Sequence, residues 1–333
     1  MVTPAITPEL LNWPELREQG WNGILIGNGA SRAVWDEFAY GSLLEKAKSN
    51  QIADPLTAED LQVFKGLGTE NFERVLAALA TAIVVNRSYG VDSQFLLQKY
   101  DAVRNALVEA VHAVHVPWGL GSEDILVAIR TELLNYNFVY STNYDLLIYW
   151  AIMEGAGVGF KDYFWNAGMF SLANVEVWDK STIVLYLHGG LHLSKLPTGQ
   201  TMKRVAGLMN LLDSFGTDQE GATPLFISEG SSDDKRRSIY NSDYLAFTYN
   251  EFSHHEGPLV IFGHSLGAGD GHLISAIRQQ SSKRIAISIV PGDERQIVEM
   301  KAHYTHYLPE FELLFFDASS HPLGSATLRI GQP

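Results

Sequence analysis

The chain has 333 residues, of which 46% are hydrophobic and 19% are charged. This composition is typical of a globular protein with one large domain or two smaller ones, and it excludes a wholly disordered chain. The formal net charge of −14 argues against binding to nucleic acid or to anionic lipid, because both need clustered Lys and Arg. A pocket that is locally positive could still bind a small anion.

The sequence contains no cysteine. Disulfides, thiol nucleophiles and zinc sites with cysteine ligands are therefore excluded, and we expect no metal cofactor. Residues 1–19 contain no apolar run of the signal-peptide type, and no window approaches the 18 apolar residues of a membrane span. We therefore expect a soluble, cytoplasmic protein without membrane contact.

Six short apolar runs predict the strands of a parallel sheet. Their hydrophobicity is continuous rather than alternating, which is typical of strands that are buried on both faces. The runs lie at 23–27, 138–141, 183–187, 259–263, 285–290 and 313–316.

Helical patterns alternate with these runs, at 31–47, 144–153 and 272–280. Strands and helices that alternate in this way predict an α/β fold with a doubly wound, mostly parallel sheet. The segment from about 190 to 258 is rich in Gly, Ser and Asp in its first part, so we expect loops there and one helix at about 232–254.

Residues 57–134 contain no strand pattern. Three helices are predicted in this stretch, at 71–85, 94–115 and 122–134. We therefore predict a helical insertion or cap at 57–134, within an α/β domain that is formed by residues 1–56 and 135–333.

The first predicted strand ends in Gly27-Asn-Gly-Ala-Ser-Arg32. Ligands of open α/β sheets bind beyond the carboxyl ends of the strands, so this turn is a candidate site. Gly27 and Gly29 would allow a tight turn close to a ligand, and Ser31 could cap a helix whose N-terminus favours phosphate. A plain strand-to-helix turn with a capping serine is the alternative.

The second strand ends in Ser141-Thr-Asn-Tyr-Asp145. Polar side chains between an apolar strand and an apolar helix cost free energy unless they bind each other or a ligand. A helix cap explains one of Thr142, Asn143 and Asp145 but not all three, which favours a functional segment.

The third strand leads into His188-Gly189-Gly190. A histidine at the carboxyl end of a strand is well placed to act as an acid or base. His192, a little further along, is more simply interpreted as a structural residue.

The fourth segment is Gly263-His-Ser265-Leu-Gly267, followed by Asp270. Gly-x-Ser-x-Gly after a strand is also the nucleophile elbow of α/β-hydrolases, which would make Ser265 the nucleophile of an esterase. The acid and histidine that could follow, Asp317 and His321, are only four residues apart. This spacing is too short for the ends of two separate strands, so the esterase is the weaker hypothesis.

Together these four segments resemble the sirtuin-like family of NAD-binding Rossmann proteins. Residues 27–31 are similar to its Gly-Ala-Gly-x-Ser phosphate loop, and residues 142–145 to its Thr-Gln-Asn-x-Asp segment. The Leu-His-Gly at 187–189 matches the segment with the family's catalytic histidine, and residues 263–270 are similar to its late Gly-x-Ser…Asp segment, which lines the adenosine side. Residues 224–228 and 244–245 further resemble a bacterial sirtuin-like family that is described as a domain of unknown function.

The resemblance implies hydrolysis of NAD rather than peptide deacylation. Deacylating sirtuins carry a four-cysteine zinc module, which this chain lacks. The Pro-Asp-Phe-Arg run after the phosphate loop is also missing, and Arg32 or residues 35–40 are the candidates to replace it. Several bacterial relatives without the zinc module are NAD hydrolases of anti-phage defence. We therefore expect an NAD glycohydrolase that forms a homo-oligomer and could bind a partner protein of a defence system.

The resemblance also assigns roles in the cleavage of the N-glycosidic bond. Asn143 would orient the ribose and a water molecule, and Asp145 would recognise the carboxamide or support the ribosyl cation. His188 would be the general base. The residues expected to bind NAD are Gly27, Asn28, Gly29, Ala30, Ser31, Arg32, Thr142, Gly263, Ser265 and Asp270.

A non-catalytic function is the main alternative. The protein could be a sensor that binds NAD or ADP-ribose and transmits the signal through residues 57–134. A pure binding protein would need neither Asn143 nor His188, so the presence of both favours the enzyme.

Overall fold

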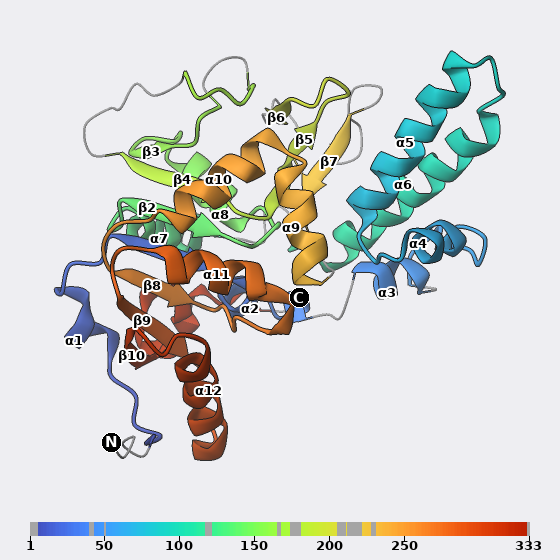
Figure 1. The fold of residues 1–333 in the computed structure, drawn as a ribbon. Coiled ribbons are helices and arrows are strands. Elements are labelled where there is room, and N and C mark those ends of the chain that lie inside the picture. The colour runs from blue at the N-terminus through green and yellow to red at the C-terminus, as the bar shows by residue number, and fades with distance from the viewer. Residues whose placement is uncertain are drawn as a thin grey trace.

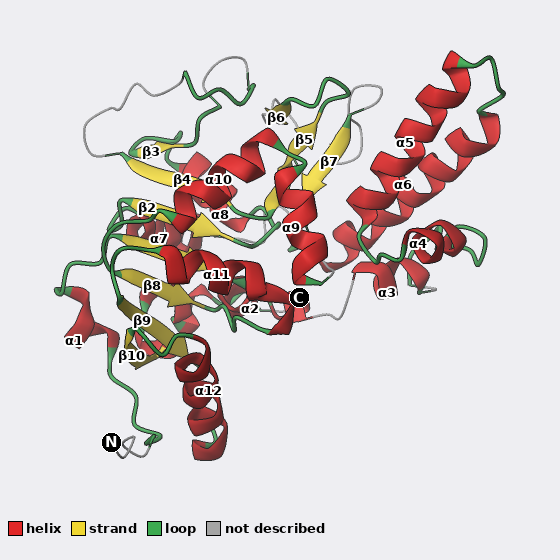
Figure 2. Ribbon diagram, viewed as in Figure 1, coloured by secondary structure: helices red, strands yellow, loops and turns green. Residues whose placement is uncertain are grey.

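The computed structural model describes residues 6–39, 43–49, 51–116, 122–164, 168–173, 181–204, 211, 222–227 and 231–331. Its centre is a seven-stranded, all-parallel sheet that is flanked by helices (Figures 1 and 2). The strands are β1 (Gly23–Ile26), β2 (Phe138–Ser141), β3 (Phe160–Lys161), β4 (Thr182–Tyr186), β8 (Leu259–Phe262), β9 (Arg284–Ile289) and β10 (Glu312–Asp317).

The order of these strands is β10-β9-β8-β1-β2-β4-β3. From β1 the chain moves outward to β2 and β4, then returns to the other side of β1 and continues through β8, β9 and β10. This reversal is the mark of a Rossmann-like doubly wound sheet, and its switch point lies between β1 and β8. The predicted fold class is confirmed, and each of the six predicted runs forms a strand within one residue of its expected ends.

A small antiparallel sheet follows β4 directly. Its order is β6-β5-β7, with β5 at Gly189–Lys195, β6 at Thr201–Lys203 and β7 at Thr223–Phe226. The expectation of only loops before the helix at 232–254 is therefore wrong. The sequence conceals β5 because two of its fully buried side chains, His192 and Ser194, are polar, so hydropathy gives no strand pattern there.

Two predicted helices are each divided into shorter elements. The helix expected at 31–47 begins instead at Asn28 and ends at Val34, because Trp35 is extended (φ −143°, ψ 113°). The helix expected at 232–254 breaks before Ser242, whose hydroxyl accepts a hydrogen bond from Leu245 N and caps a new helix. The helices are α1 (Trp13–Arg17), α2 (Asn28–Val34), α3 (Leu43–Lys48), α4 (Leu61–Leu67), α5 (Phe72–Ser88), α6 (Gln94–Val114), α7 (Glu123–Leu133), α8 (Leu147–Glu154), α9 (Ser232–Tyr240), α10 (Asp243–Ser253), α11 (Gly271–Gln279) and α12 (Glu294–Tyr307), with short 3-10 helices η1 (Asp36–Ala39), η2 (Ala268–Asp270), η3 (Ala318–Ser320), η4 (Pro322–Gly324) and η5 (Ala326–Leu328).

Helices α5 and α6 form a hairpin that projects away from the parallel sheet (Figure 1). The three helices predicted within 57–134 are present as α5, α6 and α7. In contrast to the hairpin, α7 packs against α8 and the C-terminal segment, beside the sheet. No helix in the described part of the chain is long and apolar enough to cross a membrane.

At the switch point, the turn after β1 packs backbone to backbone against the turn after β8. Gly29 N donates a hydrogen bond of 2.7 Å to Gly263 O. A Cβ on Gly29 would lie 2.7 Å from Gly263 Cα, and a Cβ on Gly27 would lie 2.5 Å from His264 Cβ. Gly263 itself has φ +67°, and a Cβ there would lie 2.4 Å from Ala30 N. The glycines are therefore required for this contact between the two turns.

We predict that Gly263→Ala is destabilised by about 2 kcal/mol or more, because a side chain at positive φ costs about 1–2 kcal/mol before any clash is counted. The matched control is Gly292→Ala, where an added Cβ meets no atom within 4 Å. Urea unfolding of the two variants should give a much lower midpoint for Gly263→Ala. Equal midpoints would contradict the requirement for glycine.

A buried polar cluster holds the C-terminal segment against α7. Leu323 N donates to His321 Nδ1 (3.1 Å), so the neutral ring carries its proton on Nε2. That nitrogen lies 3.2 Å from Tyr136 Oη and 3.4 Å from a carboxylate oxygen of Glu132. Burial lowers the pKa of His321 to about 3 and raises the pKa of Glu132.

Within this cluster His321 predicts acid sensitivity, whereas the raised pKa of Glu132 acts in the opposite direction. His321 is neutral in the folded protein and has a pKa of about 6.5 when unfolded, so the stability gained from its neutral burial is fully present above pH 6.5. That stability is lost as the pH falls from 6.5 toward 3. His321→Asn keeps an acceptor for Leu323 N but cannot titrate, so its deficit relative to wild type should shrink by up to about 1.4 kcal/mol per pH unit over this range. Unfolding curves measured at several pH values test this, and a constant deficit would contradict it.

Candidate functional site

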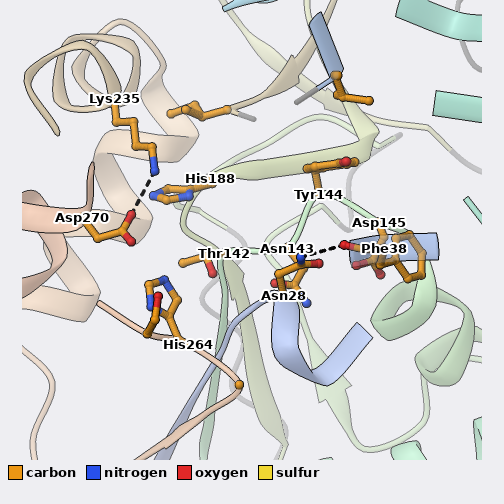
Figure 3. A pocket seen from close by; sticks show the side chains of 14 residues that line it. Asn28, Phe38, Thr142, Asn143, Tyr144, Asp145, His188, Lys235, His264 and Asp270 are labelled. Atoms are coloured by element: carbon orange, nitrogen blue, oxygen red, sulfur yellow. Dashed lines mark hydrogen bonds and ion pairs between the residues drawn. The ribbon is translucent and has the colours of Figure 1, made fainter. Parts of the chain in front are cut away.

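The described residues line an open cavity of about 250 Å³ at the carboxyl edge of the parallel sheet (Figure 3). All four segments predicted from the sequence contribute to it, from the ends of β1, β2, β4 and β8. His188, His264, Lys235 and Asp270 lie on one side in Figure 3, and Asn28, Asn143 and Asp145 lie on the other. The lining consists of Asn28, Phe38, Leu43, Thr142, Asn143, Tyr144, Asp145, His188, Ile227, Lys235, Gly263, His264, Ser265 and Asp270.

The turn after β1 contributes less than expected. Of its residues, Asn28 lines the cavity, and its side chain donates to Phe38 O at 3.0 Å. Ser31 does not cap the helix, because α2 already begins at Asn28 and Ser31 lies buried inside it. Gly29 N is already bound to Gly263 O, and Arg32 is exposed. Gly27, Gly29, Ala30, Ser31 and Arg32 are not among the described residues of the lining.

Ser31 instead links the two polar residues that follow β2. Its hydroxyl donates to Asp145 Oδ2 at 2.5 Å and accepts from Asn143 Nδ2 at 2.8 Å. Leu147 N donates to the other Asp145 oxygen at 2.9 Å. Burial raises the pKa of the Asp145 carboxyl despite these two donors. Both oxygens of Asp145 therefore accept hydrogen bonds within the protein. The carboxylate holds the Ser31 hydroxyl and the backbone at Leu147 in place.

Asn143 has one polar atom left without a partner. Its Nδ2 also donates to Gly27 O at 3.0 Å, and because a carbonyl can only accept, the amide orientation is fixed. The opposite atom, Oδ1, is buried and has no hydrogen-bond partner among the described residues. Asn143 lines the cavity while Oδ1 itself is buried, so a hydroxyl, amide or water bound there would reach Oδ1 only after a shift of the surrounding side chains.

His188 lies where the parallel sheet passes into the antiparallel one. Its carbonyl accepts from Ile227 N at 2.7 Å, and the next residue, Gly189, has φ +71°. A Cβ on Gly189 would lie 2.2 Å from Leu225 O, so β7 packs against this turn. Burial lowers the pKa of the His188 ring well below its usual value, and the ring is neutral at neutral pH.

Lys235 and Asp270 form an ion pair of 2.9 Å at the cavity wall. Burial acts to raise the pKa of Asp270, but the charges of His264 and Lys235 outweigh it and hold this pKa below its usual value. Burial lowers the pKa of His264, whereas Asp270 acts in the opposite direction. Lys235 is the one ammonium or guanidinium group in the described lining, so it supplies the positive charge there.

Ser265 is exposed at the rim of the cavity, and its carbonyl lies 3.1 Å from His303 Nε2. The pair considered for an esterase is engaged elsewhere. Asp317 accepts from Ser319 N at 2.7 Å, and both nitrogens of His321 are within hydrogen-bonding distance of partners in the cluster with Tyr136 and Leu323. The described contacts give Ser265 no acid or base from these two residues.

Sequence reasoning missed Lys235, His264 and His272, which contacts His188. Lys235 stands in the charged run 233–237, a pattern typical of a helix that faces solvent throughout. His264 lies inside the segment 263–270, in which only Gly263, Ser265 and Asp270 were predicted to bind NAD. Within the described residues, no group of three or more potential ligand side chains could hold a metal ion.

The chain belongs to the DUF4917 family. The model of this domain of unknown function matches residues 24–323, which include all of the parallel sheet except Gly23 and every described lining residue of the cavity. A search among curated proteins finds no match.

We predict that Ser31→Ala is destabilised by about 1–3 kcal/mol at pH 7, because a buried Asp145 oxygen and the Asn143 amide both lose a partner. The pKa of Asp145 is raised in the fold, so the cost of its charge appears as the pH rises above about 3.9. The Ser31→Ala deficit should therefore be smaller at pH 4 than at pH 7. The control is Ser275→Ala on α11, which removes only a bond to Gly271 O and should change stability by about 0.5 kcal/mol or less. A deficit equal to the control's at both pH values would contradict the role of Ser31.

Proposed function

We propose that the cavity binds NAD and hydrolyses the bond between its nicotinamide and ribose. The observation that carries the proposal is the pairing of Asn143 and His188. They follow two neighbouring parallel strands, are both at least 95% buried, and line one cavity. The same two positions carry the resemblance to the catalytic segments of the sirtuin-like family.

The reaction needs little from the protein at the leaving group, since nicotinamide departs from a cation. The C1′–N bond breaks and its electron pair stays on the nicotinamide nitrogen, which becomes neutral. A water oxygen forms the new bond to C1′, and its proton passes to His188, which gives it to solvent. Asn143 Oδ1 would accept a hydrogen bond from the ribose or the water and would present a negative dipole to the ribosyl cation.

Asp145 would act through its neighbours in this scheme. Its two oxygens are held by Ser31 and Leu147 N, so it fixes Ser31, and Ser31 in turn fixes the Asn143 amide. Recognition of the carboxamide by Asp145 itself would require one of these bonds to break. The positioning role is therefore the one that the contacts favour.

The size and charge of the cavity suggest how NAD would lie. A volume of about 250 Å³ is below the roughly 300–1,000 Å³ of pockets that enclose a whole ligand. The nicotinamide riboside would therefore be enclosed, and the adenosine half would lie across the rim near Ser265 and Asp270. Lys235 is the cation available to the pyrophosphate, at the cost of weakening its pair with Asp270.

A sensor of NAD or ADP-ribose is the second candidate, and one contact favours it. His115 follows the last residue of α6, and its Nε2 accepts from Leu146 N at 2.9 Å, next to Asp145. The same ring packs edge-on against Phe38, which lines the cavity. The α5–α6 hairpin therefore touches the site directly, whether it regulates hydrolysis in a defence system or reports binding to a partner.

Incubation of the purified protein with NAD tests the proposal, with nicotinamide and ADP-ribose followed by chromatography. We expect release of both products, and a loss of about 10²–10⁴-fold in His188→Asn and Asn143→Ala, the size of a general-base or positioning contribution. His254→Gln, which changes an exposed histidine bonded to Asn250 O, should keep the wild-type rate. Thermal stabilisation by NAD without release would favour the sensor. Neither release nor stabilisation would contradict both functions.

A further inference from the structure

His188 shares a hydrogen bond with a second buried histidine. Its Nε2 lies 2.8 Å from Nε2 of His272, at the start of α11, and both rings are at least 96% buried. Two neutral imidazoles can hold one proton between them at such a contact, so one ring donates and the other accepts. The direction of this bond decides what His188 offers to a ligand, because Nδ1 is the ring nitrogen that remains.

Both rings are neutral at neutral pH. Burial lowers the pKa of His272 to about 4, and it lowers the pKa of His188 well below its usual value. The charged and titratable groups that act on His272 are Lys235 and Arg236 from α9, Asp270 from η2, and His264 after β8. Of these, Lys235 and His264 act on both rings and disfavour a second proton on either of them.

The surroundings of His272 decide the direction of the bond. Its Nδ1 is buried and has no hydrogen-bond partner among the described residues. If His272 accepted from His188, this Nδ1 would carry a proton with no acceptor. If His272 donates, Nδ1 is a bare lone pair, and a buried N–H without an acceptor is the rarer of the two situations. The rarity of such a donor favours donation by His272.

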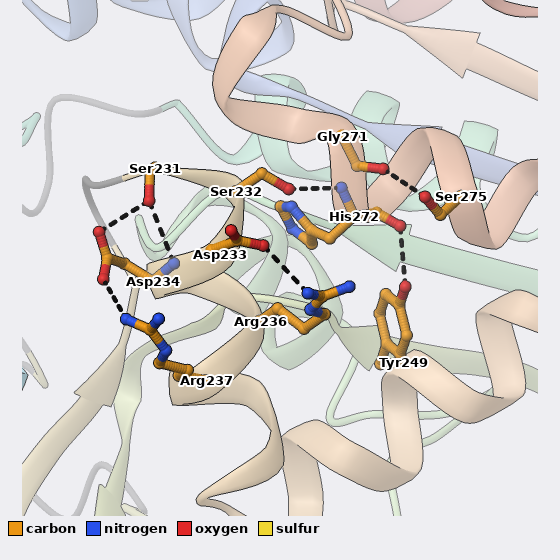
Figure 4. A network of polar contacts seen from close by, with 10 residues as sticks. All are labelled: Ser231, Ser232, Asp233, Asp234, Arg236, Arg237, Tyr249, Gly271, His272 and Ser275. Carbon is orange, nitrogen blue, oxygen red and sulfur yellow. Dashed lines mark hydrogen bonds and ion pairs between the residues drawn. The ribbon is translucent and has the colours of Figure 1, made fainter.

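His272 is also held firmly in place (Figure 4). Its backbone N donates to Ser232 Oγ of α9 at 2.8 Å, and its carbonyl accepts from Tyr249 Oη of α10 at 2.8 Å. These bonds fix the first turn of α11 between two helices. The backbone that carries the His272 ring is therefore held in place next to His188.

We propose that His272 is a positioning residue that donates its Nε2 proton to His188 and so holds His188 as the Nδ1–H tautomer in the free protein. His188 then offers a donor to a ligand in the cavity. The consequence for catalysis rests on the proposed function: to act as the base, His188 must give its Nδ1 proton to solvent and take the shared proton on Nε2, while His272 gains a proton on Nδ1. Both rings stay neutral in this exchange, and the base form is the minor one.

Nitrogen NMR of the full-length protein labelled with ¹⁵N-histidine tests the proposal at pH 7.5 without NAD. The signals of His188 are assigned by their loss in His188→Gln. We expect a protonated, pyrrole-type Nδ1 and an unprotonated, pyridine-type Nε2 in the wild-type protein. An unprotonated Nδ1 would overturn the proposal, whether or not the protein hydrolyses NAD.

Two variants test whether His272 sets this tautomer. The ionised carboxylate of His272→Glu can only accept, so Nε2 of His188 should become protonated at pH values at which this carboxylate is ionised. His272→Gln is neutral and can donate or accept, so the excess of the Nδ1–H form should fall toward equal populations and intermediate shifts. It serves as the test should the buried carboxylate of His272→Glu prevent folding. His188 shifts that stay unchanged in a folded His272 variant would overturn the role of His272. His255→Gln, which removes another buried histidine, should leave His188 unchanged.

Discussion

The close approach of two glycine turns at the switch point is the constraint on which the site depends. Gly29 N–H binds Gly263 O, and neither turn has room for a Cβ at this contact. The approach brings the segment after β8 beside the segment after β1, and with it the wall that holds His264 and Asp270. A glycine-rich turn of this kind is usually interpreted as a cradle for phosphate. In this protein the turn packs against the segment that follows β8, and the cavity lies beside it.

The sequence predicted those parts of the fold whose pattern follows from burial on both faces. The six strands, the three helices of 57–134 and the convergence of four strand ends all follow from continuous apolar runs and the order of elements. Prediction failed where buried side chains are polar. It also failed where a charged sequence pattern, typical of a solvent-facing helix, contains a residue that faces the cavity. The polar core of β5 concealed the antiparallel sheet, and the charged run 233–237 gave no sign that Lys235 faces the cavity. The extended Trp35 that ends α2 left no signal in composition.

An unpaired buried atom does not by itself mark a site in this protein. Trp13 Nε1 and Trp35 Nε1 are also buried without a partner among the described residues, and neither tryptophan belongs to the described lining of the cavity. Asn143 and His272 differ because their other contacts are strongly constrained. Each has one polar group in a short bond and the opposite group left over. The leftover atom is an acceptor on Asn143, and on His272 it is the lone pair that the proposed direction of the bond to His188 leaves.

The α5–α6 hairpin contacts both sides of the cavity through the elements that carry its polar residues. Arg74 of α5 pairs with Asp234, the neighbour of Lys235 on α9, and His115 after α6 holds Leu146, the neighbour of Asp145. α9 also binds the second residue of α11, His272, through Ser232, and so reaches the His188–His272 pair. A hairpin that only covered the sheet would need none of these contacts. Because they converge on the segments that hold Asp145, Lys235 and His272, the position of the hairpin and the geometry of the cavity are set by the same bonds.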